Sequence, residues 1–363
     1  MQRSIYLRPL GFLPAPAEEP AREEWRGLPL AGSGLAFTAL EVIERVSGGG
    51  VERRILALGE FFEREWGRHT LAASDLFEAL QTPRQRLAGL SLDRPRIMGI
   101  VNVTPDSFSD GGSLESARAA IDHALRLAEE GADILDIGGE STRPGADLVP
   151  VAEEIRRVLP VIEGLRGRTD AVISVDTRKA EVMRRAAEAG ADILNDVSAL
   201  TFEPEALRVA ADSGLPVMLM HAQGDPKTMN DDPQYSDVVL DVFDFLERRI
   251  HACEAAGIPR SKLVADPGIG FGKHLHHNVA VLAAMGLYHG LGVPVLLGAS
   301  RKKLIGQICN VEVPKERVPG SIAAALSAIA QGVQIVRVHD VAATRQAIAV
   351  WQAIQRGTEA GLS

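Results

Sequence analysis

The chain of 363 residues is 46% hydrophobic and 24% charged, and its net charge is −9 at pH 7. These values are typical of a globular protein with a large core, and the length allows one large domain or two unequal ones. The acidic balance argues against nucleic acid or a membrane surface as a partner, because both are bound by an excess of Lys and Arg. Two cysteines are too few for a disulfide scaffold, and no apolar run reaches the roughly 18 residues of a membrane span. The N-terminal stretch is interrupted by Arg8 and Pro9 and makes a poor signal peptide, so we expect a cytoplasmic protein.

Residues 1–95 predict a small α+β extension. The stretch 35–60 predicts two strands around a Ser-Gly-Gly-Gly turn, and 61–89 is mostly of helical character, with Ser74 or Asp75 as a possible N-cap. This extension is either a separate unit or a decoration of the following domain, and residues 91–96 are a plausible joint between the two. Its role is not indicated by any motif.

From residue 96 to 363 we predict one domain with an alternating βαβ rhythm. We expect strands at 97–103, 132–137, 171–175, 191–195, 216–220, 263–266, 294–298 and 334–338. We expect helices at 114–130, 150–166, 179–189, 203–213, 237–256, 275–288, 318–331 and 341–355. Eight strand–helix units over about 265 residues predict a (β/α)8 TIM barrel. The alternative is a doubly wound open sheet, although eight units is more than most such sheets contain.

Polar side chains gather where these strands end, which is the end that forms the active site in TIM barrels. One group is cationic and suits phosphate oxygens: Arg143, Lys273, Arg301, Lys302, Arg337 and His339. A second group of carboxylates and amides suits the edge of a flat heterocycle: Asp176, Asn195 and Asp266. The two groups together predict a ligand with a polyphosphate tail and a pterin-like or purine-like head. The hydroxyl-rich stretch 104–112, which follows the first of these strands, is interpreted as a mobile lid over that ligand.

For several nearby residues, a structural role is an alternative to a role in ligand binding. Asp136 is either part of the site or only a support for loop amides, and Asp196 and His221 are expected to be structural. The "HLHH" run at 274–277 is interpreted as a solvated surface run rather than a metal site, because no acidic or Cys ligands accompany it.

The ordered strings "IMGIVNVTPDSFSDGG", "DIGGESTRPGA", "SVDTRK", "LNDVSA", "LMHAQGDPKTM", "DPGIGFGK", "GASRKKLIG" and "RVHDV" resemble the motif series of the dihydropteroate synthases. The resemblance covers about residues 96–355 and leaves the extension outside. It implies a transferase of folate synthesis that joins 6-hydroxymethyl-7,8-dihydropterin diphosphate to p-aminobenzoate and releases diphosphate. It also implies a homodimer, and a p-aminobenzoate site where sulfonamides compete.

Motif positions in that family imply roles for individual residues. The positions implied to bind the pterin are Asp176, Asn195, Met220, Asp266 and Lys302. The positions implied to bind the diphosphate are Asn102, Arg143, Arg337 and His339, and Asn102 is also implied to bind Mg2+. The positions implied to form the p-aminobenzoate pocket are Thr142, Pro144, Phe271 and Ser300. The catalytic set is Asp176, Lys302, Arg337 and Asn102.

These residue types suit a dissociative substitution. Departure of diphosphate leaves positive charge on a carbon conjugated with the dihydropterin ring, so cations and Mg2+ neutralise the leaving oxygens while Asp176 stabilises the cation. Two other hypotheses are open. A pterin-dependent methyltransferase on a related barrel would keep Asp176 and Asn195 but would not need the cations, and a non-catalytic binding module is conceivable for residues 1–95.

Overall fold

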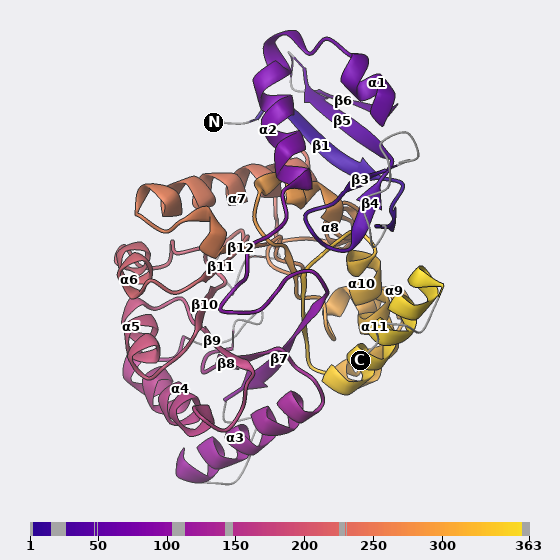
Figure 1. Cartoon of the computed structure of the whole chain (residues 1–363). Coiled ribbons are helices and arrows are strands. Elements are labelled where there is room, and N and C mark those ends of the chain that lie inside the picture. Colours follow the sequence, from indigo (N-terminus) through magenta and orange to yellow (C-terminus); the bar gives the residue numbers. More distant parts are fainter. Residues whose placement is uncertain are drawn as a thin grey trace.

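A nearly closed ring of parallel strands forms the main body of the computed structural model (Figure 1). The structure describes residues 3–15, 27–46, 48, 50–103, 113–141, 148–224, 229 and 231–357. The strands are β7 (Arg96–Asn102), β8 (Ile134–Gly138), β9 (Val172–Asp176), β10 (Ile193–Asp196), β11 (Val217–Met220), β12 (Leu263–Asp266), β13 (Leu296–Leu297) and β14 (Ile335–Val338). They pair in the order β12-β11-β10-β9-β8-β7-β14-β13, and a bridge between Ala265 and Val295 joins the two ends. The predicted TIM barrel is confirmed, and the open doubly wound sheet is wrong.

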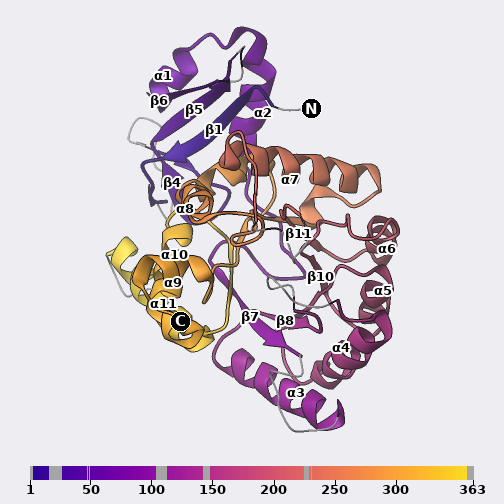
Figure 2. The same cartoon turned by 180° about the vertical axis from the view of Figure 1, so that it is seen from behind.

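Helices surround this ring, as the sequence predicts (Figure 2). They are α3 (Ser113–Glu129), α4 (Val151–Leu165), α5 (Ala180–Glu188), α6 (Ala206–Ser213), α7 (Val238–Ala255), α8 (Leu275–Ala283), α10 (Val318–Ile329) and α11 (Val341–Arg356). Three details differ from prediction. The helix expected to reach residue 288 ends at Ala283 and continues as a 3-10 helix, η4 (Met285–Leu291). The short α9 (Lys303–Cys309) was not predicted, and β13 spans only the two residues Leu296–Leu297.

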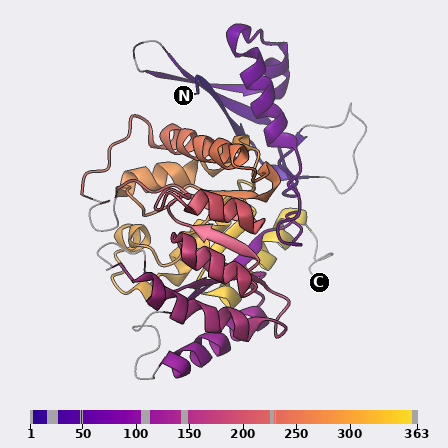
Figure 3. The same ribbon diagram turned by 90° about the vertical axis from the view of Figure 1, so that its left-hand side faces the viewer.

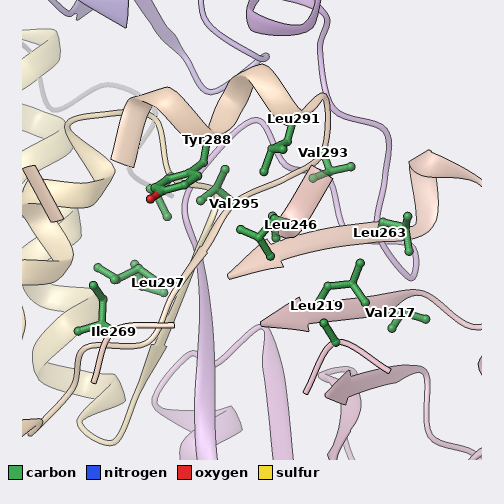
Figure 4. Packing of buried hydrophobic residues seen from close by; sticks show 14 of the residues in the cluster. Val217, Leu219, Leu246, Leu263, Ile269, Tyr288, Leu291, Val293, Val295 and Leu297 are labelled. Atoms are coloured by element: carbon green, nitrogen blue, oxygen red, sulfur yellow. The ribbon is translucent and has the colours of Figure 1, made fainter. Parts of the chain in front are cut away.

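Side chains alternate between the two faces of each barrel strand, which separates an outer from an inner layer. The outer layer is continuous with the surrounding helices. Figure 4 shows Leu219 of β11 and Leu263 of β12 near Leu246 of α7 and Tyr288 of η4. All four side chains are fully buried. The large apolar core therefore lies between the strands and the helices, which leaves the barrel interior for other side chains.

The floor of the barrel interior is an apolar cluster to which every strand contributes one residue. These residues are Met98, Ile134, Val172, Ile193, Met218, Val264, Leu296 and Ile335. Leu87 and Leu92, which precede β7, pack into the same cluster and are 1% and 3% exposed. Leu87 and the predicted joint at residues 91–96, through Leu92, thus close the amino-terminal end of the barrel, which in this fold serves stability rather than chemistry.

The described part of the N-terminal extension contains two small antiparallel sheets, two α-helices and the 3-10 helix η1 (Gly67–His69). One sheet has the order β1-β5-β6, from β1 (Ile5–Leu10), β5 (Ala39–Arg45) and β6 (Val51–Ala57). The other is formed by β2 (Leu13–Pro14), β4 (Leu35–Phe37) and β3 (Leu28–Pro29). The β5–β6 hairpin was predicted, whereas β1 was not. The helices are α1 (Leu58–Glu63) and α2 (Thr70–Gln81), so the proposed cap at Ser74 or Asp75 is wrong, since both residues lie within α2.

The extension sits on the outer face of α7 and η4 (Figure 3). Its residues Tyr6 and Leu76 belong to the same apolar core as Phe243 of α7 and Tyr288 of η4. The Tyr6 hydroxyl donates to Asp244 Oδ1 at 2.7 Å, and Arg45 Nη2 lies 3.0 Å from Asp241 Oδ1. Tyr6 and Arg45 of the extension thus contact the acidic side chains Asp241 and Asp244 of α7. Because the extension and the barrel share one apolar core, the extension packs onto the barrel as a decoration.

Candidate active site

The carboxyl ends of the strands bring the predicted polar residues to one mouth. Residues two apart in a strand point to the same face of the sheet. The residues two and four positions after each floor residue therefore also point into the barrel, near its carboxyl end. The residues reached include Asn102, Asp136, Asp176, Asn195, Met220, Asp266, Gly298 and Arg337. A Cβ atom placed on Gly298 would lie 3.8 Å from Asp266 Oδ2 and 3.9 Å from Lys302 Nζ. Side chains from β12 and from the loop after β13 therefore converge.

Arg337 of β14 connects two acidic residues of neighbouring strands. Its Nε donates to Asp136 Oδ2 at 2.6 Å, and its Nη2 donates to Asp176 Oδ2 at 2.7 Å. Asp136 is fully buried, and Asp176 is 9% exposed. One guanidinium therefore serves two carboxylates, which leaves the second oxygen of Asp176 available at the mouth.

Asn195 of β10 is held by the same buried carboxylate. Its Nδ2 donates to Asp136 Oδ1 and Oδ2 at 3.3 and 3.1 Å. Asp136, which the sequence left open between a site role and a support role, thus supports two site residues at once. The neighbouring Asp196 points to the outer face, where it accepts the amides of Ser198 and Leu200, as expected for a structural carboxylate.

Asp266 and Lys302 form a second charged group across the mouth. Asp266 Oδ1 accepts the Gly268 amide at 2.7 Å, and Lys302 Nζ donates to the carbonyl of Ile269. Met220, at the end of β11, is paired in register with Asp266 and is 4% exposed. A carboxylate, an ammonium and a thioether are thus placed side by side, which matches the polar edge and the apolar face of a heterocycle.

The two described residues of the predicted p-aminobenzoate pocket lie next to this group. The Phe271 ring centroid is 4.6 Å from Lys302 Nζ. Ser300 Oγ is 3.0 Å from His339 Nδ1 and also accepts the His339 backbone amide at 3.2 Å. Thr142, Arg143 and Pro144, like the predicted lid at 104–112, lie outside the described residues.

Two residues expected among the phosphate-binding cations have other partners. Lys273 is 4% exposed and donates to the Gly268 and Phe271 carbonyls, with His221 Nδ1 at 2.8 Å. It holds the loop after β12 from inside the protein. Arg301 Nε pairs with Asp340 Oδ2 at 3.0 Å. The ion pair of Arg301 resembles those that Arg337 makes with Asp136 and Asp176, so a role for Lys273 or Arg301 as a cation of the ligand site stays a prediction.

A buried ionic cluster beneath the loop after β8 was not predicted. Lys179 Nζ lies between Glu140 Oε2 and Glu154 Oε2, each at 2.5 Å, and it also donates to the Val149 carbonyl at 2.7 Å. Glu140 in turn accepts the Val149 amide at 2.9 Å. Residues 140 and 149 are thus fastened together, at the base of the segment that carries Thr142, Arg143 and Pro144. The "TRK" string did contain this lysine, but its partners are far away in the sequence.

Burial shifts the pKa values of the charged residues at the mouth. Burial raises the pKa of Asp176 to about 7, opposed by the charge of Arg337 and assisted by that of Asp136. Burial also raises the pKa of Asp266, against the effect of Lys302. It lowers the pKa of Lys302 to about 8, against the effect of Asp266. Strongly shifted groups that face each other across one mouth are typical of functional sites.

The mouth fits a divalent metal that arrives with a phosphate-bearing ligand. In the described ranges, no three His, Cys, Asp or Glu side chains are grouped as metal ligands, and this includes the "HLHH" run. Mg2+ prefers oxygen ligands and is often held by one or two protein groups together with substrate phosphates. The amide oxygen of Asn102, at the end of β7, is a donor atom of the kind that Mg2+ prefers. Among the described residues, the carboxylates Asp136, Asp176 and Asp266 of the mouth outnumber the cations Lys302 and Arg337, so a bound diphosphate would need further positive charge.

Comparison with known proteins agrees with this geometry. A family model described as pterin binding enzyme matches residues 98–339. The dihydropteroate synthase of Escherichia coli K12 is 52% identical over 264 residues, which are 73% of this chain and 93% of that protein. Two structures of the Xanthomonas albilineans dihydropteroate synthase are also similar. The one with 4-aminobenzoic acid has a TM-score of 0.71 and 57% identity and covers 75% of this chain and 98% of that one. The one with 7,8-dihydropteroate has a TM-score of 0.68 and 54% identity, with coverage of 75% and 99%.

The barrel, its polar mouth and the family match define a pterin-binding enzyme. Its relatives at about half identity are synthases rather than methyltransferases. The chain belongs to the dihydropteroate synthases, and it is a transferase of folate synthesis. The predicted family and activity are confirmed. None of the helices in the described part of the chain combines the length and apolar character of a membrane span.

Proposed function

We propose that this mouth joins 6-hydroxymethyl-7,8-dihydropterin diphosphate to p-aminobenzoate, with the roles divided between its two sides. Asp176, Asn195 and Asp266 accept the N–H donors of the pterin, Lys302 donates to its acceptors, and Met220 packs on the ring. The single observation that carries this division is the meeting of β8, β9 and β14 through the Asp136–Arg337–Asp176 bridge, opposite the Asp266–Lys302 group.

The leaving group would be bound by residues at the carboxyl ends of β14 and β7, together with Arg143. Arg337, His339, Arg143 and Asn102 take the diphosphate oxygens, and Asn102 holds Mg2+ through its amide oxygen. Bound there, Mg2+ would supply Lewis-acid charge to the leaving oxygens. Arg337 is already oriented by two carboxylates, so its guanidinium need not reorganise as negative charge develops, which is the condition for strong electrostatic stabilisation.

The bond that breaks joins the pterin methylene carbon to the diphosphate oxygen. Both electrons leave with the oxygen, and positive charge spreads from the methylene into the dihydropterin ring. Asp176 offers a carboxylate to this charge. The amine nitrogen of p-aminobenzoate then forms the C–N bond and loses one proton, giving 7,8-dihydropteroate, diphosphate and H+. A neutral arylamine needs no strong base to attack the electron-poor carbon.

The p-aminobenzoate would lie between Phe271, Ser300, Thr142 and Pro144. Phe271 offers a ring face at the edge of the pterin site, and Ser300, fixed by His339, offers a hydroxyl. Sulfonamides, which present the same aniline group, are expected to compete here.

Calorimetry tests this assignment most simply. Pterin diphosphate should bind the full chain more tightly with Mg2+ than without it, and an Asp176→Ala variant should lose most of this binding. Failure of the unchanged protein to bind pterin diphosphate under either condition would refute the assignment.

Two further features belong to the same proposal. A homodimer through the outer helices is supported by an exposed apolar surface on α10 and α11, where Val350 and Ile354 are 55% and 71% exposed. Sedimentation of the full chain at micromolar concentration measures this state directly. Cytoplasmic location is supported by Cys253 and Cys309, which do not pair with each other.

A further inference from the structure

Asp136 is a buried carboxylate whose contacts go to protein side chains that themselves face the ligand. It is fully buried, and it accepts from Arg337 Nε at 2.6 Å and from Asn195 Nδ2 at 3.1 and 3.3 Å. A carboxylate accompanied by an arginine at this distance is an acceptor only. Every group that forms a hydrogen bond with the Asp136 carboxylate must therefore be the donor.

This property determines which way the Asn195 amide faces. The amide has one oxygen and one NH2 group, and turning it over would place the oxygen against the carboxylate, acceptor against acceptor. Asp136 therefore holds Nδ2 toward itself and Oδ1 away. No hydrogen bond to Asn195 Oδ1 is present among the residues that the structure describes, so this acceptor is available to a ligand.

We propose that Asp136 is a positioning residue that sets which heterocycle the mouth accepts. It keeps Asn195 presenting an oxygen, in line with the carboxylates of Asp176 and Asp266, so the mouth offers three acceptors toward the ring edge. This pattern selects rings that carry an amino group and N–H donors over rings that carry a carbonyl at the same position. The inference rests on the proposed role of Asn195 in pterin binding.

The test compares two ligands that differ at the 2-position of the ring. These are 6-hydroxymethylpterin, with a 2-amino group, and its 2-oxo counterpart, whose neutral ring also carries a proton on N1. Dissociation constants are measured by calorimetry for the unchanged chain, for Asp136→Asn and Asp136→Ala, and for Ser174→Ala as the control. Ser174 is the register neighbour of Asp136 on β9, and its buried hydroxyl has no hydrogen-bond partner within the described residues. Any effect of losing the Asp136–Arg337 contact acts on both ligands and cancels in their ratio.

A site built to accept hydrogen bonds rejects an analogue that lacks the donor, so the unchanged chain should prefer the amino ring by roughly 100-fold or more. In Asp136→Asn and Asp136→Ala the amide can turn, and we expect the preference to fall by about tenfold, since a misplaced buried hydrogen bond costs about that much. Ser174→Ala should keep the full preference.

The outcomes separate this inference from the proposed function. If the unchanged chain binds neither ring, the proposed function fails. If it prefers the amino ring and folded Asp136→Asn keeps that preference unchanged, the role of Asp136 is refuted while pterin binding stands. Asp136→Ala decides the matter in the same way if Asp136→Asn does not fold, and loss of preference in Ser174→Ala would also overturn the inference.

Discussion

Replacing Asp176 by Asn tests the proposed stabilisation of the ring cation. The substitution keeps the size of the side chain and keeps one carbonyl oxygen for the hydrogen bond from Arg337, now 2.7 Å from Asp176 Oδ2. Arg337 also retains its contact with Asp136 at 2.6 Å. The geometry of the mouth should therefore persist, and the principal change is the loss of one negative charge beside the pterin.

The size of the effect follows from the charges. Opposite charges about 4 Å apart attract by about 4 kcal/mol at an effective dielectric constant near 20. The positive charge of Arg337 already offsets part of the Asp176 charge, and the remaining amide dipole compensates a further part. We therefore expect about 3 kcal/mol of lost transition-state stabilisation, which corresponds to a fall in kcat of roughly 100-fold or more. Ground-state pterin binding should weaken by only about tenfold, because a hydrogen-bond acceptor is retained.

The assay is single-turnover diphosphate release with saturating p-aminobenzoate and Mg2+, together with calorimetry of pterin diphosphate. Asp196→Asn is the matched control, because it neutralises a buried carboxylate at the end of the next strand but on the outer face. A folded Asp176→Asn protein whose kcat falls less than about fivefold, or no more than that of the control, would refute the role assigned to the charge.

Three further predictions concern pH, the buried ionic cluster and the barrel floor. Because the mechanism needs Asp176 ionised and Lys302 protonated, and burial places their pKa values at about 7 and about 8, kcat/KM should rise with pH up to about 7 and fall above about 8. Lys179→Met leaves the buried Glu154 without its cation and leaves Glu140 with Arg178 alone, so urea unfolding should show a loss of about 3–5 kcal/mol, against little change for the exposed Lys303→Met. Leu87→Ala opens a cavity in the barrel floor and should cost about 2–5 kcal/mol in the same assay, against a near-neutral Leu71→Ala, since Leu71 is 80% exposed.

A specific experimental result would contradict each of these three predictions. A kcat/KM that is flat between about pH 6 and 9 would show that neither shifted group governs catalysis. A Lys179→Met protein as stable as the Lys303 control would show that the cluster contributes no net stability. An equal effect of the two leucine substitutions would mean that Leu87 does not pack into the floor.

The sequence predicted the barrel and most of its mouth because both depend on local patterns. Short apolar runs followed by helical stretches identify βαβ units, and the position directly after each run identifies the carboxyl end. Asp176, Asn195, Asp266 and Arg337 could be placed in this way without any knowledge of their contacts.

The features that the sequence did not predict depend on contacts between distant segments. Strand β1 pairs with β5 some thirty residues away and contains Arg8 and Pro9, so its own composition is a weak strand signal. Lys273 and Lys302 both follow barrel strands, and only the packing of Lys273 against His221 shows that it faces inward. Asp136 could not be assigned, because its role is defined by Asn195 and Arg337 on two other strands.

The most direct test of the central claim is turnover by the purified full chain. With pterin diphosphate, p-aminobenzoate and Mg2+, we predict 7,8-dihydropteroate and diphosphate in equal amounts, with product absent when either substrate is omitted. Diphosphate release without pteroate, or no release at all from a protein shown to be folded, would contradict the account.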